Sequence, residues 1–191
     1  FADMPFTGKE LGKIILEEHN VNNVSINSIK KLDHYNPIDK KIHISEDKIN
    51  KKSITSISVV AHEIGHAIQD KHNYKPLKLR QTLIEKTSIL QKIGSFLLII
   101  GLPSIFAFTK SPFITLLAGI IIMGCLSTNV LIHLVTLPVE FDASNRALKV
   151  LEKYVPKKNI KQCRSVLRAA AFTYLAQSIV SIFRLKIILL S

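Results

Sequence analysis

The chain has 191 residues, 47% of them hydrophobic, and a formal net charge of +12. That length suits one globular domain or a small membrane protein, and a mean hydropathy of +0.25 favours a membrane protein with cationic loops. No nucleic-acid-binding motif accompanies the positive charge, so we expect no nucleic-acid partner, and a soluble nucleic-acid binder is the weakest interpretation. Cys125 and Cys163 do not suggest a disulfide framework.

The N-terminal part predicts one helix followed by a small sheet. Thr7 is the expected N-cap of an amphipathic helix over about residues 8–19. Extended segments follow at 24–26, 29–35 and 41–45, and the last two flank an Asn-Pro turn, which predicts a β-hairpin. An exposed edge at Lys41–Ser45 would allow pairing with an extended substrate.

An HExxH pentapeptide lies in a predicted helix over about residues 53–71. Residues four apart share one helix face, so His62 and His66 can hold one Zn²⁺ and Glu63 can act as general base. The alternative is a pair of surface histidines beside a carboxylate. The apolar residues on both sides argue against it, because two histidines and a glutamate are costly to bury without a role.

Two apolar runs, 93–109 and 113–137, are separated only by Lys110–Pro112. The second run carries no formal charge and is long enough to cross about 30 Å of hydrocarbon, while the first is at the short limit. The sequence therefore predicts a transmembrane helical hairpin. The alternative is a hydrophobic core hairpin in a soluble bundle.

Two crossings return the chain to the side it left, so the pentapeptide and the segment after the hairpin face one compartment. The flanks of the hairpin are rich in lysine and arginine, whereas its tip holds Lys110 alone. The positive-inside rule then predicts a multi-pass protein of the cell membrane whose histidines face the cytoplasm.

The C-terminal part predicts a helix over 139–154, with Pro138 in its first turn, and another from Asn159 onward. The apolar segment 169–190 is either a third membrane helix or an interfacial one. We expect one membrane metallopeptidase domain over 1–191. Its parts are an N-terminal part at 1–92, the hairpin at 93–137, and a C-terminal part at 138–191. The C-terminal part would contain a helix that supplies a third metal ligand, followed by the apolar helix.

A catalytic zinc site usually has three protein ligands, and three residues are candidates for the third. His72 stands where a longer zinc motif has its last histidine, but Gln69 replaces the glycine that would turn the chain back. His133 lies inside the second apolar run. Glu140 is the strongest candidate, because it follows the hairpin on the expected side of the membrane. Asp142 is either an oriented partner of a ligand histidine or a solvated carboxylate.

The chain also resembles the membrane-bound neutral zinc metallopeptidases of bacteria. The resemblance spans most of the chain, and the stretches that carry it are 33–37, 61–69, 74–80, 134–144 and 169–174, with Leu-Pro-Val-Glu-Phe-Asp-Ala-Ser the most specific.

The resemblance implies zinc at His62 and His66 with Glu63 as base. The wider relatives are membrane gluzincins, whose third ligand is a Glu in a Glu-x-x-Ala-Asp pattern. Glu140 matches that Glu, and Ser144 stands where the relatives have Asp. Family members generally carry an apolar helix before the region that matches Phe1, so we expect a truncated chain.

The expected fold is a mainly α integral membrane protein, with a zincin-like helical core, a small β-hairpin or sheet and the transmembrane hairpin. The expected function is zinc-dependent hydrolysis of peptide or protein substrates at the lipid bilayer. His34, Tyr35 and Tyr174 are candidate oxyanion donors. The alternative is a non-catalytic zinc-binding scaffold or chaperone-like membrane protein, against which an intact Glu63 argues. No feature of the sequence indicates an oligomeric state.

Overall fold

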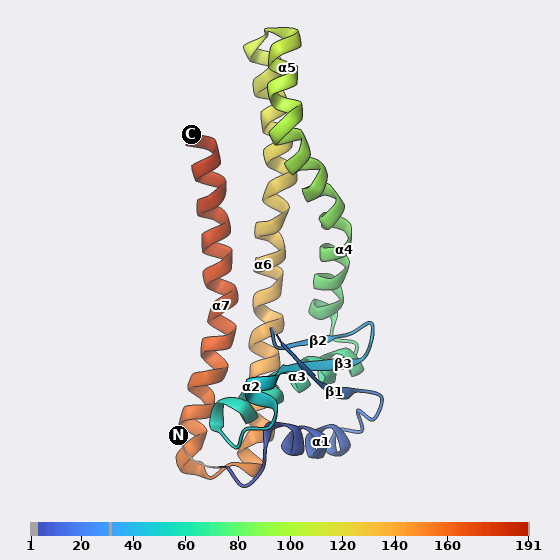
Figure 1. The fold of residues 1–191 in the computed structure, drawn as a ribbon, viewed down its shortest axis with the longest axis vertical. Helices are drawn as coiled ribbons and strands as arrows, with labels where there is room; N and C mark the ends of the chain where they lie inside the picture. Colours follow the sequence, from blue (N-terminus) through green and yellow to red (C-terminus); the bar gives the residue numbers. More distant parts are fainter. Residues whose placement is uncertain (1–3, 31, 191) are drawn as a thin grey trace. The chain divides into compact units, whose positions relative to one another are not determined.

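The computed structural model describes residues 4–30 and 32–190, apart from the helical side chains at 126, 129–130, 174–175 and 177–190. It is mainly helical with a small three-stranded sheet, as the sequence predicted (Figure 1). The elements are α1 (Gly8–Glu18), β1 (Ser25–Ile29), β2 (His34–Asn36), β3 (Lys41–Ser45), α2 (Glu46–Ile49), α3 (Ile54–Lys71), α4 (Lys75–Phe96), the π-helical turn η1 (Leu97–Gly101), α5 (Leu102–Thr109), α6 (Pro112–Tyr154) and α7 (Lys157–Leu190).

These elements belong to two compact units. Residues 1–78 and 137–173 form the first, and residues 79–136 and 174–191 form the second. The predicted division into parts at 92 and 137 stays a prediction. Every residue of the expected metal site lies in the first unit.

Helix α1 begins with a capping box, in which the Thr7 hydroxyl accepts from the backbone of Glu10 and the Glu10 carboxylate accepts from the backbone of Thr7. Its apolar face is buried against α3. A Cβ at Gly12 would lie 2.8 Å from Val60 on α3, so the absence of a side chain there allows the two helices to approach closely. The helix expected at residues 8–19 is therefore confirmed.

The sheet has the strand order β1-β3-β2. Strands β2 and β3 pair antiparallel, which confirms the expected hairpin, and β1 pairs parallel to β3 on its other side. Lys41–Ser45 is therefore the central strand, and the expectation of an exposed edge there is wrong. Local alternation predicted the strand, but the parallel partner comes from a segment beyond the hairpin, which a local pattern does not indicate.

Helix α3 runs beneath the sheet and is buried along nearly its whole length (Figure 1). Ser53 caps its start by accepting a hydrogen bond from the backbone of Ser56. A Cβ at Gly65 would lie 2.6 Å from the carbonyl oxygen of Ala143 on α6. The glycine inside the HExxH pentapeptide thus lets the backbone of α6 pass directly against α3.

In the part of the chain whose side chains are described, one helix is long and apolar enough to cross a membrane. It covers Lys75–Thr109, and Pro112–Cys125 is a shorter apolar helix. Lys110 ends α5 in the left-handed conformation with φ of 48°, two residues before Pro112. The turn between the two apolar runs thus lies where it was expected, while the second crossing at 113–137 stays a prediction.

Helix α6 passes through Pro138, although the sequence predicted that a helix would start there. A proline inside a helix removes one backbone hydrogen bond and costs about 3 kcal/mol. Val139, Ala143 and Ala147 follow it on one buried face, and their packing offsets that cost. The preference of proline for the start of a helix is therefore outweighed by burial of the residues around Glu140.

Candidate metal centre

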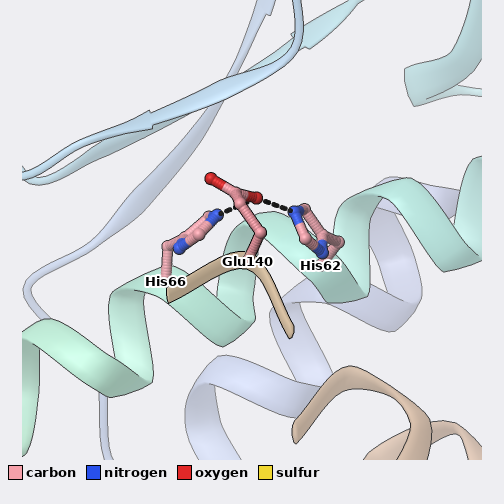
Figure 2. A group of neighbouring side chains, drawn as sticks. All are labelled: His62, His66 and Glu140. Carbon is pink, nitrogen blue, oxygen red and sulfur yellow. Dashed lines mark hydrogen bonds and ion pairs between the residues drawn. The ribbon is translucent and has the colours of Figure 1, made fainter. Parts of the chain in front are cut away.

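His62 and His66 lie one turn apart on α3 and are both buried. Their rings meet edge to face with centroids 4.9 Å apart, and both Nε2 atoms point to the same side of the helix (Figure 2). The spacing within the pentapeptide therefore produces the arrangement that helical geometry predicts.

Glu140 reaches the two imidazoles from α6, 78 residues away in the sequence from His62. Its Oε2 atom lies 3.0 Å from His62 Nε2 and 3.3 Å from His66 Nε2, and the side chain has no exposed surface. Figure 2 shows the carboxylate between the two rings. One ligand atom from each residue lies within 4.8 Å of the other two.

The donor set fits a zinc ion. Two imidazole nitrogens and one carboxylate oxygen are the ligands of a common class of catalytic zinc site, which leaves a fourth position for water or substrate. Burial alone would raise the pKa of Glu140, but its hydrogen bonds with His62 and His66 outweigh burial and lower the pKa. The carboxylate is thus held in the ionised form that a metal ion requires.

A buried glutamine fixes the orientation of His66. His66 Nδ1 lies 3.0 Å from Oε1 of Gln69, whose Nε2 donates to the Val139 carbonyl and to Asp142 Oδ2, each at 2.8 Å. Arg146 Nε donates to the same Asp142 oxygen at 2.6 Å. Because the amide donates to two acceptors, its oxygen faces His66 and accepts from Nδ1–H, which directs Nε2 toward Glu140 and the place that a metal would take.

His62 is oriented by a hydroxyl group instead. Its Nδ1 lies 3.2 Å from Ser144 Oγ, which lies 3.3 Å from the carbonyl oxygen of Leu167 on α7. With Nδ1–H donating to the hydroxyl and the hydroxyl donating to the carbonyl, His62 also directs its Nε2 toward Glu140. Ser144 thus occupies the place in the site that the motif comparison assigned to an aspartate.

Glu63 is buried and lies next to His62 in the sequence. Burial raises its pKa to about 7; His62 lowers the pKa, Glu140 raises it, and a hydrogen bond from the backbone of Tyr35 lowers it. A carboxyl group with a pKa near neutrality both accepts and releases protons readily, as a general acid–base residue must.

The remaining residues expected at the site are held elsewhere. The Tyr35 hydroxyl donates to Asp70 at 2.6 Å, and His34 is exposed and stacks on His43 with ring centroids 4.8 Å apart. His72 is the exposed C-cap of α3, with its Nδ1 3.4 Å from Arg146.

None of these three belongs to the group of potential ligands that the described residues form, and their roles stay predictions. His133 lies on α6 and is also outside the group. The side chain of Tyr174 falls outside the described residues.

Sequence reasoning missed Gln69 as a functional residue, because it was considered only as a position that lacks glycine. A signal was present, since Gln69 lies three residues after His66 and therefore on the same helix face. Asp142, for which the sequence left open a histidine partner or a solvated carboxylate, accepts from Gln69, which in turn contacts His66.

Comparison with known proteins agrees with this site. The family described as "Putative neutral zinc metallopeptidase" matches residues 2–191. "Putative membrane protease YugP" of Bacillus subtilis (strain 168) is 31% identical over 187 residues, which cover 94% of this chain and 77% of that protein. No solved structure matches the chain.

Proposed function

This chain belongs to the family of putative neutral zinc metallopeptidases, and on that premise we propose that it is a zinc-dependent endopeptidase of the membrane. The observation that carries the proposal is the buried group of His62, His66 and Glu140, which brings two imidazoles and a carboxylate from α3 and α6 together. Three ligands with an adjacent buried glutamate are the parts that hydrolysis requires.

Each residue has a distinct role in the proposed mechanism. His62, His66 and Glu140 hold the metal, and Gln69 and Ser144 keep the two imidazoles in the correct tautomer. When bound, zinc would polarise the scissile carbonyl and lower the pKa of a water to about 7. Glu63 takes the proton from the attacking water and passes it to the leaving amine.

The mechanism is tested with the purified full chain, with unfolded β-casein as the probe substrate. We expect about one zinc per chain and cleavage that stops when a chelator removes the metal. Glu63→Gln should keep zinc and lower the cleavage rate by about 10²- to 10⁴-fold, the usual contribution of a general base.

Glu152→Gln, an exposed glutamate on α6, is the matched control and should leave both quantities unchanged. Zinc bound without cleavage in the wild type, or equal cleavage by Glu63→Gln, would favour the non-catalytic scaffold instead.

We further propose that the apolar runs cross the membrane as a hairpin and that the metal site faces the cytoplasm. The apolar helix Lys75–Thr109, the turn at Lys110 and the relative's name as a membrane protease support this. The test replaces Lys110 or Lys157 with cysteine and adds a membrane-impermeant thiol reagent to intact cells. Lys110→Cys should react from outside, and Lys157→Cys only after lysis; the opposite pattern would reverse the orientation.

A further inference from the structure

A cavity of about 600 Å³ lies between the parts of α6 and α7 in the first unit, separate from the group of three metal-binding residues. Its buried lining residues are Ser144, Leu167 and Ala171, which form its floor. The volume is in the range of small-molecule sites in proteins. Neither the proposed mechanism nor the comparisons assign it a role.

The rim of the cavity is positively charged. Arg164 and Arg168 line it one turn apart on α7, and both are exposed. Among the described residues, no carboxylate pairs with either guanidinium, and none lines the cavity. Two like charges four residues apart repel each other unless an anion lies between them, so the site suits a phosphate that both guanidinium groups can grip.

The cavity lies on the side of His62 away from the metal-binding group. His62 Nε2 faces Glu140, whereas Nδ1, on the opposite edge of the ring, faces the Ser144 hydroxyl in the cavity floor. None of His62, His66 and Glu140 lines the cavity, which argues against a substrate segment as its occupant.

An exposed aromatic pair adds an apolar edge to the rim. Phe141 and Phe172 line the cavity and meet edge to face with centroids 6.1 Å apart. They are 41% and 50% exposed, which is unfavourable in water and favourable at the interface of a bilayer. Along the chain, α7 continues from Phe172 into the apolar segment 174–190.

We propose that this cavity binds the headgroup of an anionic phospholipid. Arg164 and Arg168 hold its phosphate, and Phe141 and Phe172 contact the start of its acyl chains. Basic pockets at the polar edge of membrane helices bind such headgroups, whereas a free phosphate would leave the aromatic pair unused. The proposal does not require that the protein hydrolyses peptides.

The test titrates the purified full chain in a neutral detergent with dioctanoyl phosphatidylglycerol, and native mass spectrometry counts the bound lipid. We expect saturable binding of one lipid per chain. Arg164→Gln with Arg168→Gln should weaken it by about 25-fold, since each arginine contributes roughly a factor of five. Lys157→Gln with Lys161→Gln removes the same charge from exposed positions on α7 outside the cavity and should leave the affinity within about two-fold.

The arginine and lysine variants alter only exposed side chains, and circular dichroism checks that both keep their helicity. Equal binding of dioctanoyl phosphatidylcholine, or equal loss in the arginine and lysine pairs, would overturn the proposal. Inorganic phosphate that binds as tightly as the lipid would assign the cavity to a free anion, and displacement of the lipid by an acetylated peptide would assign it to a peptide carboxylate. Either result contradicts the lipid site.

Discussion

The two histidines of the pentapeptide look equivalent in the sequence, yet their surroundings differ. His66 is held by Gln69, a fully buried amide with hydrogen bonds of 2.8–3.0 Å to three partners. His62 is held by Ser144 through longer contacts of 3.2 and 3.3 Å, and that hydroxyl borders an open cavity. The difference indicates that the protein holds the His66 ring tightly and leaves the His62 ring more adaptable.

The largest effect on zinc affinity is expected at Glu140, whose carboxylate contacts both histidines. Glu140→Gln replaces a carboxylate with a neutral amide, which is a weak zinc ligand, so zinc affinity should fall by more than about 100-fold, the upper end for residues that merely orient ligands. Competition with a chelator measures the affinity, with Glu152→Gln as control. Zinc binding as tight as in the wild type would remove Glu140 from the metal site.

The next largest effect is expected at Gln69. Gln69→Ala leaves His66 Nδ1, the Val139 carbonyl and Asp142 without their buried partner. Zinc affinity should fall by about 10- to 100-fold, and the free energy of unfolding by about 3 kcal/mol. Thermal unfolding without zinc separates the two effects.

Gln162→Ala, at an exposed position on α7, is the matched control for Gln69→Ala. If both glutamine variants bind zinc as the wild type does, the amide does not orient His66.

A smaller effect is expected at Ser144. Ser144→Ala should weaken zinc binding by only about three- to ten-fold, because water in the cavity can accept the hydrogen bond from His62 in place of the hydroxyl. The ratio of the Gln69→Ala and Ser144→Ala affinities, measured in one titration series, quantifies the difference between the two histidines. A loss for Ser144→Ala as large as that for Gln69→Ala contradicts it.

The smallest effect is expected at Asp33, which is not one of the potential metal ligands among the described residues. Burial would raise the pKa of Asp33, but Lys48 and the Ser45 backbone N–H, each donating at 2.7 Å, outweigh burial and lower the pKa below its ordinary 3.8. A lowered folded-state pKa means that the stabilisation is complete above the ordinary value and is lost as pH falls through the folded value.

Asp33→Asn should therefore cost about 1 kcal/mol at neutral pH, and the difference from the wild type should vanish in acid. Thermal unfolding against pH measures the effect. Zinc affinity should not change; if it does, zinc binding reports general stability rather than the surroundings of the histidines.

Short-range sequence patterns predicted several of the elements that the structure contains. The capping box at Thr7, the hairpin between β2 and β3, and the helix through His62 and His66 follow from residues within a few positions of each other. Short-range patterns fail where contacts with a distant segment determine the position of a strand or the start of a helix. The parallel partner β1 made Lys41–Ser45 the central strand, and burial of the face after Pro138 kept α6 helical through a residue that ordinarily starts a helix.

The sequence by itself determined that His62 and His66 share one side of a helix, because helical periodicity places side chains four positions apart on one face. It also determined the family, through the stretches that surround both motifs. Only the tertiary structure decided that Ser144 orients His62 and that the α6 residues Val139 and Asp142 hold Gln69 in place, since those contacts depend on how closely α6 approaches α3. Gly65 against the Ala143 backbone sets that approach, and packing across 78 residues of chain cannot be read from local periodicity.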